Sequence, residues 1–210
     1  MTLVVRTADA GPKATPQTIV FPVLAQTTYM DDFGDRDPAA HTRGSTGAKV
    51  AAGQVVGYVG DSGDANGLHP HLHFELHPNR SRAVDPYPWL QHAQHLLFAA
   101  PRGSPFTLKL RGKVILVSED AIRLKATSVS AWPMAQHQSK LSKSLLVLVP
   151  ETAIVQTVKK FGAPGAAADL TGARPGESVE LWTSAAPTTL KAERGDDLAL
   201  SASLVSLVGS

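Results

Sequence analysis

The sequence predicts a mostly β protein built from two units, and three observations lead to this prediction. Gly and Pro account for 17 and 15 of the 210 residues, so the chain has many turns. Apolar residues, 43% of the chain, fall in short runs bounded by turn residues, which is typical of strands and not of long helices. Two prolines, a glycine and a serine interrupt this pattern within residues 100–105, where we expect a linker.

Composition excludes several classes of function. The formal net charge is only +2, from 20 basic and 18 acidic residues, so the sequence predicts no nucleic acid partner. There is no Cys, which excludes disulfides, thiolate zinc sites and a cysteine nucleophile, so any metal site must use carboxylates and the eight His. We expect no membrane span and no signal peptide, because no apolar run has the required length; localisation therefore stays open.

The first unit is expected over residues 21–99, after a loose N-terminal arm at 1–20 that shows no periodicity. Residues 49–60, KVAAGQVVGYVG, predict a β-hairpin, because short apolar runs flank a tight Ala-Gly turn. Residues 71–77 alternate as a strand does, and residues 87–98 place apolar side chains at helical spacing behind a Pro start signal. The first unit is thus a small sheet closed by one helix.

The second unit is expected over residues 106–210 as a small β-barrel or sandwich domain. Six strand-like runs predict it, at 106–117, 122–129, 145–150, 154–158, 178–182 and 198–208. Trp132 and Trp182, with Lys159 and Lys160, are candidates for lining a binding groove. Core packing of the two Trp and edge protection by the two Lys is the interpretation that we favour.

The strongest chemical signal is a histidine cluster over residues 69–77, HPHLHFELH. If this segment is a strand, the odd-numbered side chains from His71 to His77 point to one face and the even-numbered ones, all apolar, point to the other. Two imidazoles two residues apart on a strand can share a metal ion and its water. A water-exposed polar face is the alternative, but four His within nine residues favour a site.

Motifs in a defined order join this cluster. A glycine-rich stretch at 47–63 is followed by HLHFEL at 71–76 and DPYPWL at 85–90, while FPV at 21–23 and DFGD at 32–35 precede them. Over residues 21–92 the chain therefore resembles the lysostaphin-type (LytM-like) zinc metallopeptidase family. The resemblance implies a β-sheet peptidase domain, one zinc ion as cofactor, peptidoglycan peptides as partners, and a location in the cell envelope or outside the cell.

The resemblance also implies roles for single residues. The second His of the family's H-x-H motif is a zinc ligand and the first assists catalysis, which implies His73 as metal ligand and His71 as general base or transition-state stabiliser. The remaining ligands belong to an H-x-G-x-D motif. Its counterpart here is HTRGS at 41–45, in which the Gly is displaced and Ser45 replaces the Asp. His41 is therefore the weaker candidate ligand.

This departure predicts an incomplete site. Between Ser45 and the glycine-rich stretch the chain lacks the central strands of the family, so we expect an abbreviated domain with open sheet edges that permit self-association. Possible replacement ligands are Asp32, Asp35, Asp37, His69 and His77. The sequence predicts a peptidoglycan-directed zinc metalloendopeptidase-family protein with weak or no activity; the alternative is a non-catalytic envelope-binding or regulatory module.

Overall fold

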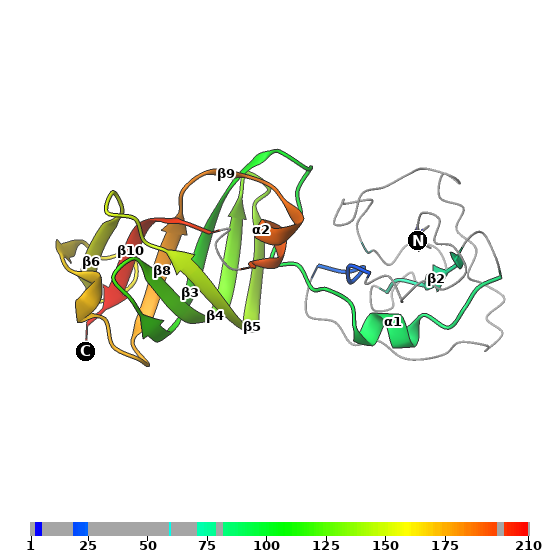
Figure 1. Ribbon diagram of the computed structural model, residues 1–210, viewed down its shortest axis with the longest axis horizontal. Helices are drawn as coiled ribbons and strands as arrows, with labels where there is room; N and C mark the ends of the chain where they lie inside the picture. Colours follow the sequence, from blue (N-terminus) through cyan, green and yellow to red (C-terminus); the bar gives the residue numbers. More distant parts are fainter. Residues whose placement is uncertain are drawn as a thin grey trace. The chain divides into compact units, whose positions relative to one another are not determined.

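A computed structural model describes residues 3–5, 19–24, 59, 71–78, 82–196 and 200–209 (Figure 1). The chain divides into two compact units, Met1–His95 and Leu96–Ser210. The described residues are mostly β, as the sequence predicts, and their longest strands belong to the second unit. Within the described part of the chain, no helix is long and apolar enough to cross a membrane.

The first unit contains strands β1 (Leu3–Val5) and β2 (Phe74–Leu76), which pair in parallel, and helix α1 (Tyr87–Gln91). Strand β1 lies within residues 1–20, where the sequence predicts a loose arm. Its sequence, Leu-Val-Val, is apolar and rich in β-branched residues, which suits a strand once a partner is available. That partner lies about 70 residues away in the sequence, so local periodicity did not reveal the pairing.

Helix α1 is shorter than the helix expected over residues 87–98. Asp85 begins it by accepting the backbone N–H of Tyr87 through Oδ1 at 2.8 Å, and proline occupies its first turn. The helix ends at Gln91 because the chain then pairs with an earlier segment: Gln94 donates its N–H to Ile19 O and accepts the N–H of Phe21, both at 2.9 Å. A tertiary bridge thus replaces the expected last turns.

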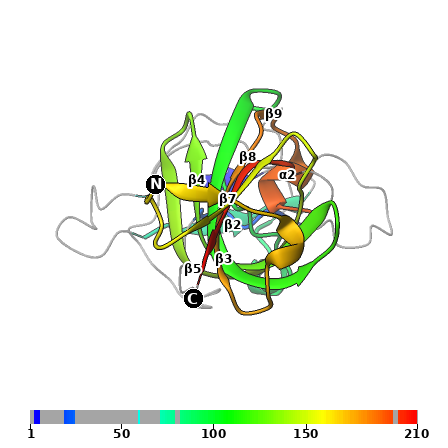
Figure 2. The same cartoon turned by 90° about the vertical axis from the view of Figure 1, so that its left-hand side faces the viewer.

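The second unit is built on one open eight-stranded sheet (Figures 1 and 2). Its strands are β3 (Pro105–Val117), β4 (Ala121–Trp132), β5 (Gln136–Leu148), β6 (Ile154–Val158), β7 (Gly165–Ala167), β8 (Ser178–Thr183), β9 (Ala186–Pro187) and β10 (Ala202–Val208). The order is β5-β4-β3-β8-β10-β6-β7, with β9 paired to β3. All neighbours are antiparallel except β10 and β6. A parallel bridge from Leu148 to Ser201 brings the end of β5 beside the start of β10.

Alternation explains the two faces of this sheet. In β3, Phe106, Leu108 and Leu110 are buried, whereas the residues between them are only partly buried. Gly112 of the same strand has no room for a side chain, because a Cβ there would collide with the backbone carbonyl of Lys125 on β4. The ladder between β3 and β4 shifts register at this glycine, between Arg111 and Gly112.

The core of the second unit begins before the expected linker. Leu97, Phe98 and Ala100 are all buried in it, and the Phe98 ring lies 4.6 Å from that of Phe106. Glutamine side chains of β5 hold this segment: Gln136 exchanges two hydrogen bonds with the backbone of Ala99, at 2.8 and 2.9 Å. The division at His95/Leu96 therefore lies upstream of residues 100–105, because buried apolar side chains tie residues 97–100 to the sheet.

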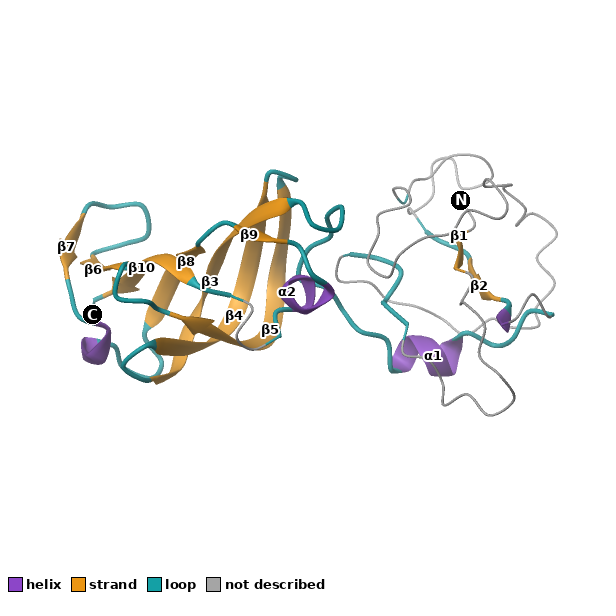
Figure 3. Cartoon of the chain, turned by 45° about the horizontal axis from the view of Figure 1, so that its top comes forward, coloured by secondary structure: helices purple, strands orange, loops and turns teal. Residues whose placement is uncertain are grey.

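Short helices complete the second unit (Figure 3). Helix α2 (Leu190–Arg194) begins at Thr189, whose Oγ1 accepts the N–H of Ala192 at 3.1 Å, and ends at Gly195 with φ of 71°. It lies against β5, since Lys143 donates to the backbone carbonyl of Arg194. The 3-10 helix η3 (Leu170–Gly172) follows β7. We did not predict either helix, because each is too short to show periodicity.

Candidate functional site

The candidate site lies beside strand β2, which has backbone partners on both sides. Strand β1 pairs with it in parallel, from Leu3 opposite Phe74 to Val5 opposite Leu76. On the other side, Val84 donates its N–H to Leu76 O at 2.9 Å. Because two-sided pairing fixes the pleat, it also fixes the direction of successive side chains in this segment.

His71 and His73 come directly before β2 and lie on the same side of the chain. Their ring centroids are 5.1 Å apart and the ring planes meet at 65°, an edge contact. His71 is exposed and His73 is half-buried. The regular strand begins only at Phe74, later than expected, but the alternation still gives the shared side on which two imidazoles can serve one ion or one water.

Glu75 and His77, the next two polar residues on this side of the segment, also contact each other. His77 Nε2 and Glu75 Oε2 are joined by a hydrogen bond of 2.9 Å, in which the carboxylate is the acceptor. Glu75 is exposed and His77 is half-buried. Since this bond occupies Nε2, His77 could replace a missing metal ligand through that atom only by giving up Glu75.

The apolar side of the segment faces a small core. Leu76 is buried with 3% of its surface exposed, and Phe74 packs against a cluster of Ile19, Phe21 and Leu90. Leu72 is only half-buried. This cluster anchors the segment from behind, so that His71 and His73 are offered on the opposite side.

The other candidate ligands lie outside the described residues, and their roles stay predictions. They are His41, His69, Asp32, Asp35 and Asp37, together with Ser45 at the position of the family's Asp. The expected glycine hairpin also falls there, apart from Val59. Within the described ranges, no group of three His, Asp or Glu side chains is placed to hold a metal ion.

Comparison with protein families identifies the segment that carries these histidines. Residues 38–86 match the model of Peptidase family M23. The match covers less than a quarter of the chain and includes His41, His71 and His73. It is narrower than the resemblance at residues 21–92, and it includes no part of the second unit. Neither the curated proteins nor the solved structures gave a match.

The M23 match shows similarity for this segment alone, so its chemistry is argued from the residues themselves. His71 and His73 are brought together, as the H-x-H spacing predicts. The hydrogen bond between Glu75 and His77 was not predicted, although i, i+2 spacing on a strand was the signal that could have indicated it. The structure therefore defines two adjacent side-chain pairs, one imidazole–imidazole and one imidazole–carboxylate.

Proposed function

We propose that the first unit is a peptidoglycan-directed domain of the zinc metalloendopeptidase type, with an incomplete zinc site and weak or no hydrolytic activity. The M23 match, which contains the H-x-H motif, is the observation that carries this proposal. The contact between His71 and His73 supports it, because both imidazoles must lie on one side of the chain to serve one reaction centre. Ser45 at the position of a ligand Asp supports the weak activity.

The described residues do not by themselves complete a zinc site. His73 is the proposed ligand, whereas catalytic zinc uses three protein ligands and one open position. His41 is the second proposed ligand, and a neutral Ser45 hydroxyl would neither neutralise the cation nor donate as a carboxylate does. When bound, zinc in such sites activates a water and polarises a carbonyl. His71 is exposed and adjacent, so it is the proposed proton acceptor for a water on this side.

The alternative is a non-catalytic module that binds or regulates the cell envelope. The displaced glycine and the Ser45 of the segment HTRGS favour it, because both changes weaken metal binding and leave the remaining surface intact. Under either proposal the protein works in the envelope or outside the cell, in contact with peptidoglycan peptides. The two proposals differ in whether the protein holds zinc.

For the second unit we propose a partly open β-barrel that acts as an accessory domain. Its support is the bridge between Leu148 and Ser201, which brings β5 beside β10 at one end of the sheet. This bridge connects β5 to β10, so the strand order becomes β3-β4-β5-β10-β8. Because β8 also pairs with β3, these five strands form a closed ring. Strands β6 and β7 then extend the sheet beyond the barrel.

Zinc stoichiometry tests the function proposed for the first unit. Purified full chain, dialysed against a weak chelator, is expected to retain well below one equivalent of zinc and to release little or no soluble product from peptidoglycan. His73→Ala should lower the residual zinc further, whereas His92→Ala, an exposed residue directly after α1, is the matched control and should not. One retained equivalent, with peptidoglycan solubilisation abolished by His71→Ala, would show instead that the site is complete and active.

A further inference from the structure

The outer face of the second unit's sheet carries an aromatic pair that the core does not need. Trp132 at the end of β4 and Trp182 on β8 flank strand β3, and their rings stack above it with centroids 5.1 Å apart at 29°. Trp132 has 38% of its surface exposed, and Trp182 is partly buried. The expectation that both Trp pack in the core is therefore wrong: they lie on the opposite face of the sheet, away from the core cluster.

Lys109 completes this feature, which we call the Trp–Lys platform (Trp132, Trp182 and Lys109). Lys109 lies on β3 between the two aromatic strands, and its Nζ is 5.6 Å from the ring centroid of Trp132 and 5.4 Å from that of Trp182. A cation over two aromatic faces holds both rings in place. The platform thus presents a fixed apolar surface bordered by a positive charge, and Lys159 and Lys160 are not part of it.

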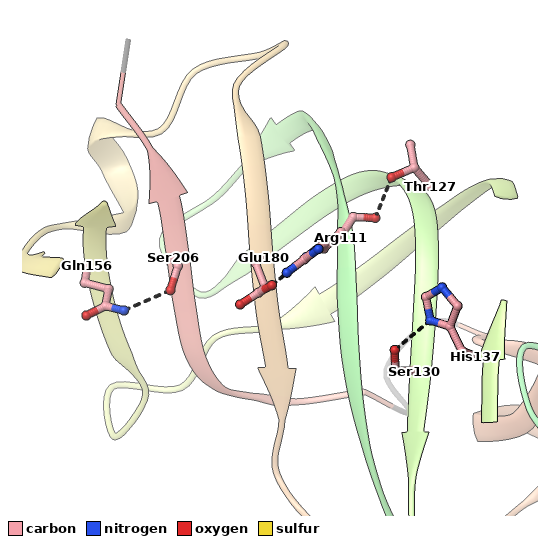
Figure 4. Close-up of polar contacts among 7 residues, drawn as sticks. All are labelled: Arg111, Thr127, Ser130, His137, Gln156, Glu180 and Ser206. Carbon is pink, nitrogen blue, oxygen red and sulfur yellow. Dashed lines mark hydrogen bonds and ion pairs between the residues drawn. The ribbon is translucent and has the colours of Figure 1, made fainter. Parts of the chain in front are cut away.

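The surface beside the platform is basic and rich in hydrogen-bonding groups. Lys113 follows Lys109 on the same face of β3 and is directly opposite Lys125 of β4. Among the described residues no ion pair involves these three lysines, whereas Arg111 between them is neutralised by Glu180 at 2.6 Å. Hydroxyl and amide side chains lie on the same face, and Figure 4 shows them. They are Thr127 and Ser130 on β4, and Gln156 on β6, which donates to the buried Ser206 hydroxyl at 2.9 Å.

We propose that the Trp–Lys platform binds the glycan strands of peptidoglycan. The apolar face of a sugar ring packs on an indole, and the neighbouring hydroxyl and amide groups match sugar hydroxyls and N-acetyl groups. The unpaired lysine charges complement the carboxylates that the sugars and their peptide stems carry. The choice of polymer rests on the proposed function of the first unit, but the binding itself uses no residue of that unit and no metal.

Single-stranded nucleic acid is the other polymer that stacks on aromatic side chains beside basic residues. Two observations favour the glycan. The two indoles already stack on each other, so no base can enter between them. The net charge of the whole chain is only +2, too small to attract a polyanion over a distance.

Binding of defined glycans to the full chain tests this proposal. The probes are peptide-free glycan strands that keep their lactyl carboxylates, and a neutral hexamer of N-acetylglucosamine. Emission of the two platform indoles reports binding in a Trp89→Phe background, since the chain has three Trp. Trp132→Ala should weaken binding of both probes roughly 3- to 10-fold. Lys109→Met should weaken binding of the carboxylated strands and change binding of the neutral hexamer less than twofold.

A control substitution distinguishes loss of the Trp–Lys platform from a nonspecific effect of mutation on glycan binding. Lys191→Met removes an exposed lysine on α2, outside the sheet, and should not change glycan binding. Thermal melts of each variant show that the sheet is folded. His73→Ala and a chelator should leave glycan binding unchanged, so loss of the proposed peptidase function would not remove this signal.

Three results would overturn the proposal. The first is glycan binding that survives both Trp132→Ala and Lys109→Met. The second is tighter, Trp132-dependent binding of a single-stranded DNA oligomer than of either glycan. The third is the absence of binding to both glycans by the folded protein with its natural side chains at positions 109 and 132.

Discussion

The two units of this chain differ in what their residues do. In the first unit the described core is a cluster of three buried residues, and the recognisable motif, His71 to His77, lies against it on a short strand. In the second unit a core of 24 buried residues joins strands of up to 13 residues, and the M23 match does not extend into it. Chemistry that can be read from a motif and stability that comes from burial therefore occupy different parts of the molecule.

The largest expected effect concerns the boundary between the units. A fragment of residues 96–210 should fold cooperatively, whereas a fragment of 104–210 should be largely unfolded, because it lacks the buried Phe98 and Leu97. Loss of one buried Phe costs about 3–5 kcal/mol, which approaches the whole stability of many domains. Thermal melts by circular dichroism check this. Equal melting temperatures for the two fragments would return the boundary to residues 100–105.

A single core substitution sharpens the same comparison. Phe106→Ala should lower the free energy of unfolding of the second unit by about 3–5 kcal/mol, because this ring is buried and packs on Phe98. Phe74→Ala in the first unit is the matched variant, and it should leave that transition unchanged. Urea unfolding followed by the emission of Trp132 and Trp182, in a Trp89→Phe background, reports the second unit alone. A shift caused by Phe74→Ala would show that the units unfold together.

The next effect depends on pH and concerns helix α2. Burial raises the pKa of Glu193 to about 7, although the backbone N–H of Ala100 partly offsets this by donating to its carboxylate. The folded state therefore holds a proton that the unfolded state loses at lower pH, and stability should fall as pH rises from about 4.5 to 7. Glu193→Gln should remove this loss and stabilise the second unit by about 1–3 kcal/mol above pH 7.

Urea unfolding at pH 5 and pH 8 measures this prediction. Glu151→Gln, in an exposed turn after β5, is the control and should leave the difference between the two pH values unchanged. A Glu193→Gln variant that keeps the full pH dependence of the natural protein would assign that dependence to another group.

The smallest expected effect is at the ion pair between Arg111 and Glu180. Arg111 Nε lies 2.6 Å from Glu180 Oε2, but the Arg111 side chain is 43% exposed, so water screens the attraction. A double-mutant cycle with Arg111→Gln and Glu180→Gln should give a coupling of about 0–1 kcal/mol that decreases in high salt. A coupling above about 2 kcal/mol would contradict the exposed character of this face.

The sequence alone determined the features that depend on local patterns. Alternation and turn residues predicted β3, β4, β6, β8 and β10 of the second unit, and β6 lies at the predicted residues 154–158. The run predicted at 145–150 covers only the last four residues of β5. The spacing of His71 and His73 predicted that they share one side of the chain, because adjacent residues on an extended backbone point in opposite directions. These features need only a few neighbouring residues.

Only the tertiary structure decided the features that join distant segments. Residues 136–144 of β5 are mostly polar, and they form a strand because β4 pairs with them. Leu3–Val5 becomes a strand because β2 is beside it, and Trp132 meets Trp182 because β3 lies between their strands. Such contacts depend on which segments the fold brings together, and a local pattern holds no information about a partner 50 or more residues away.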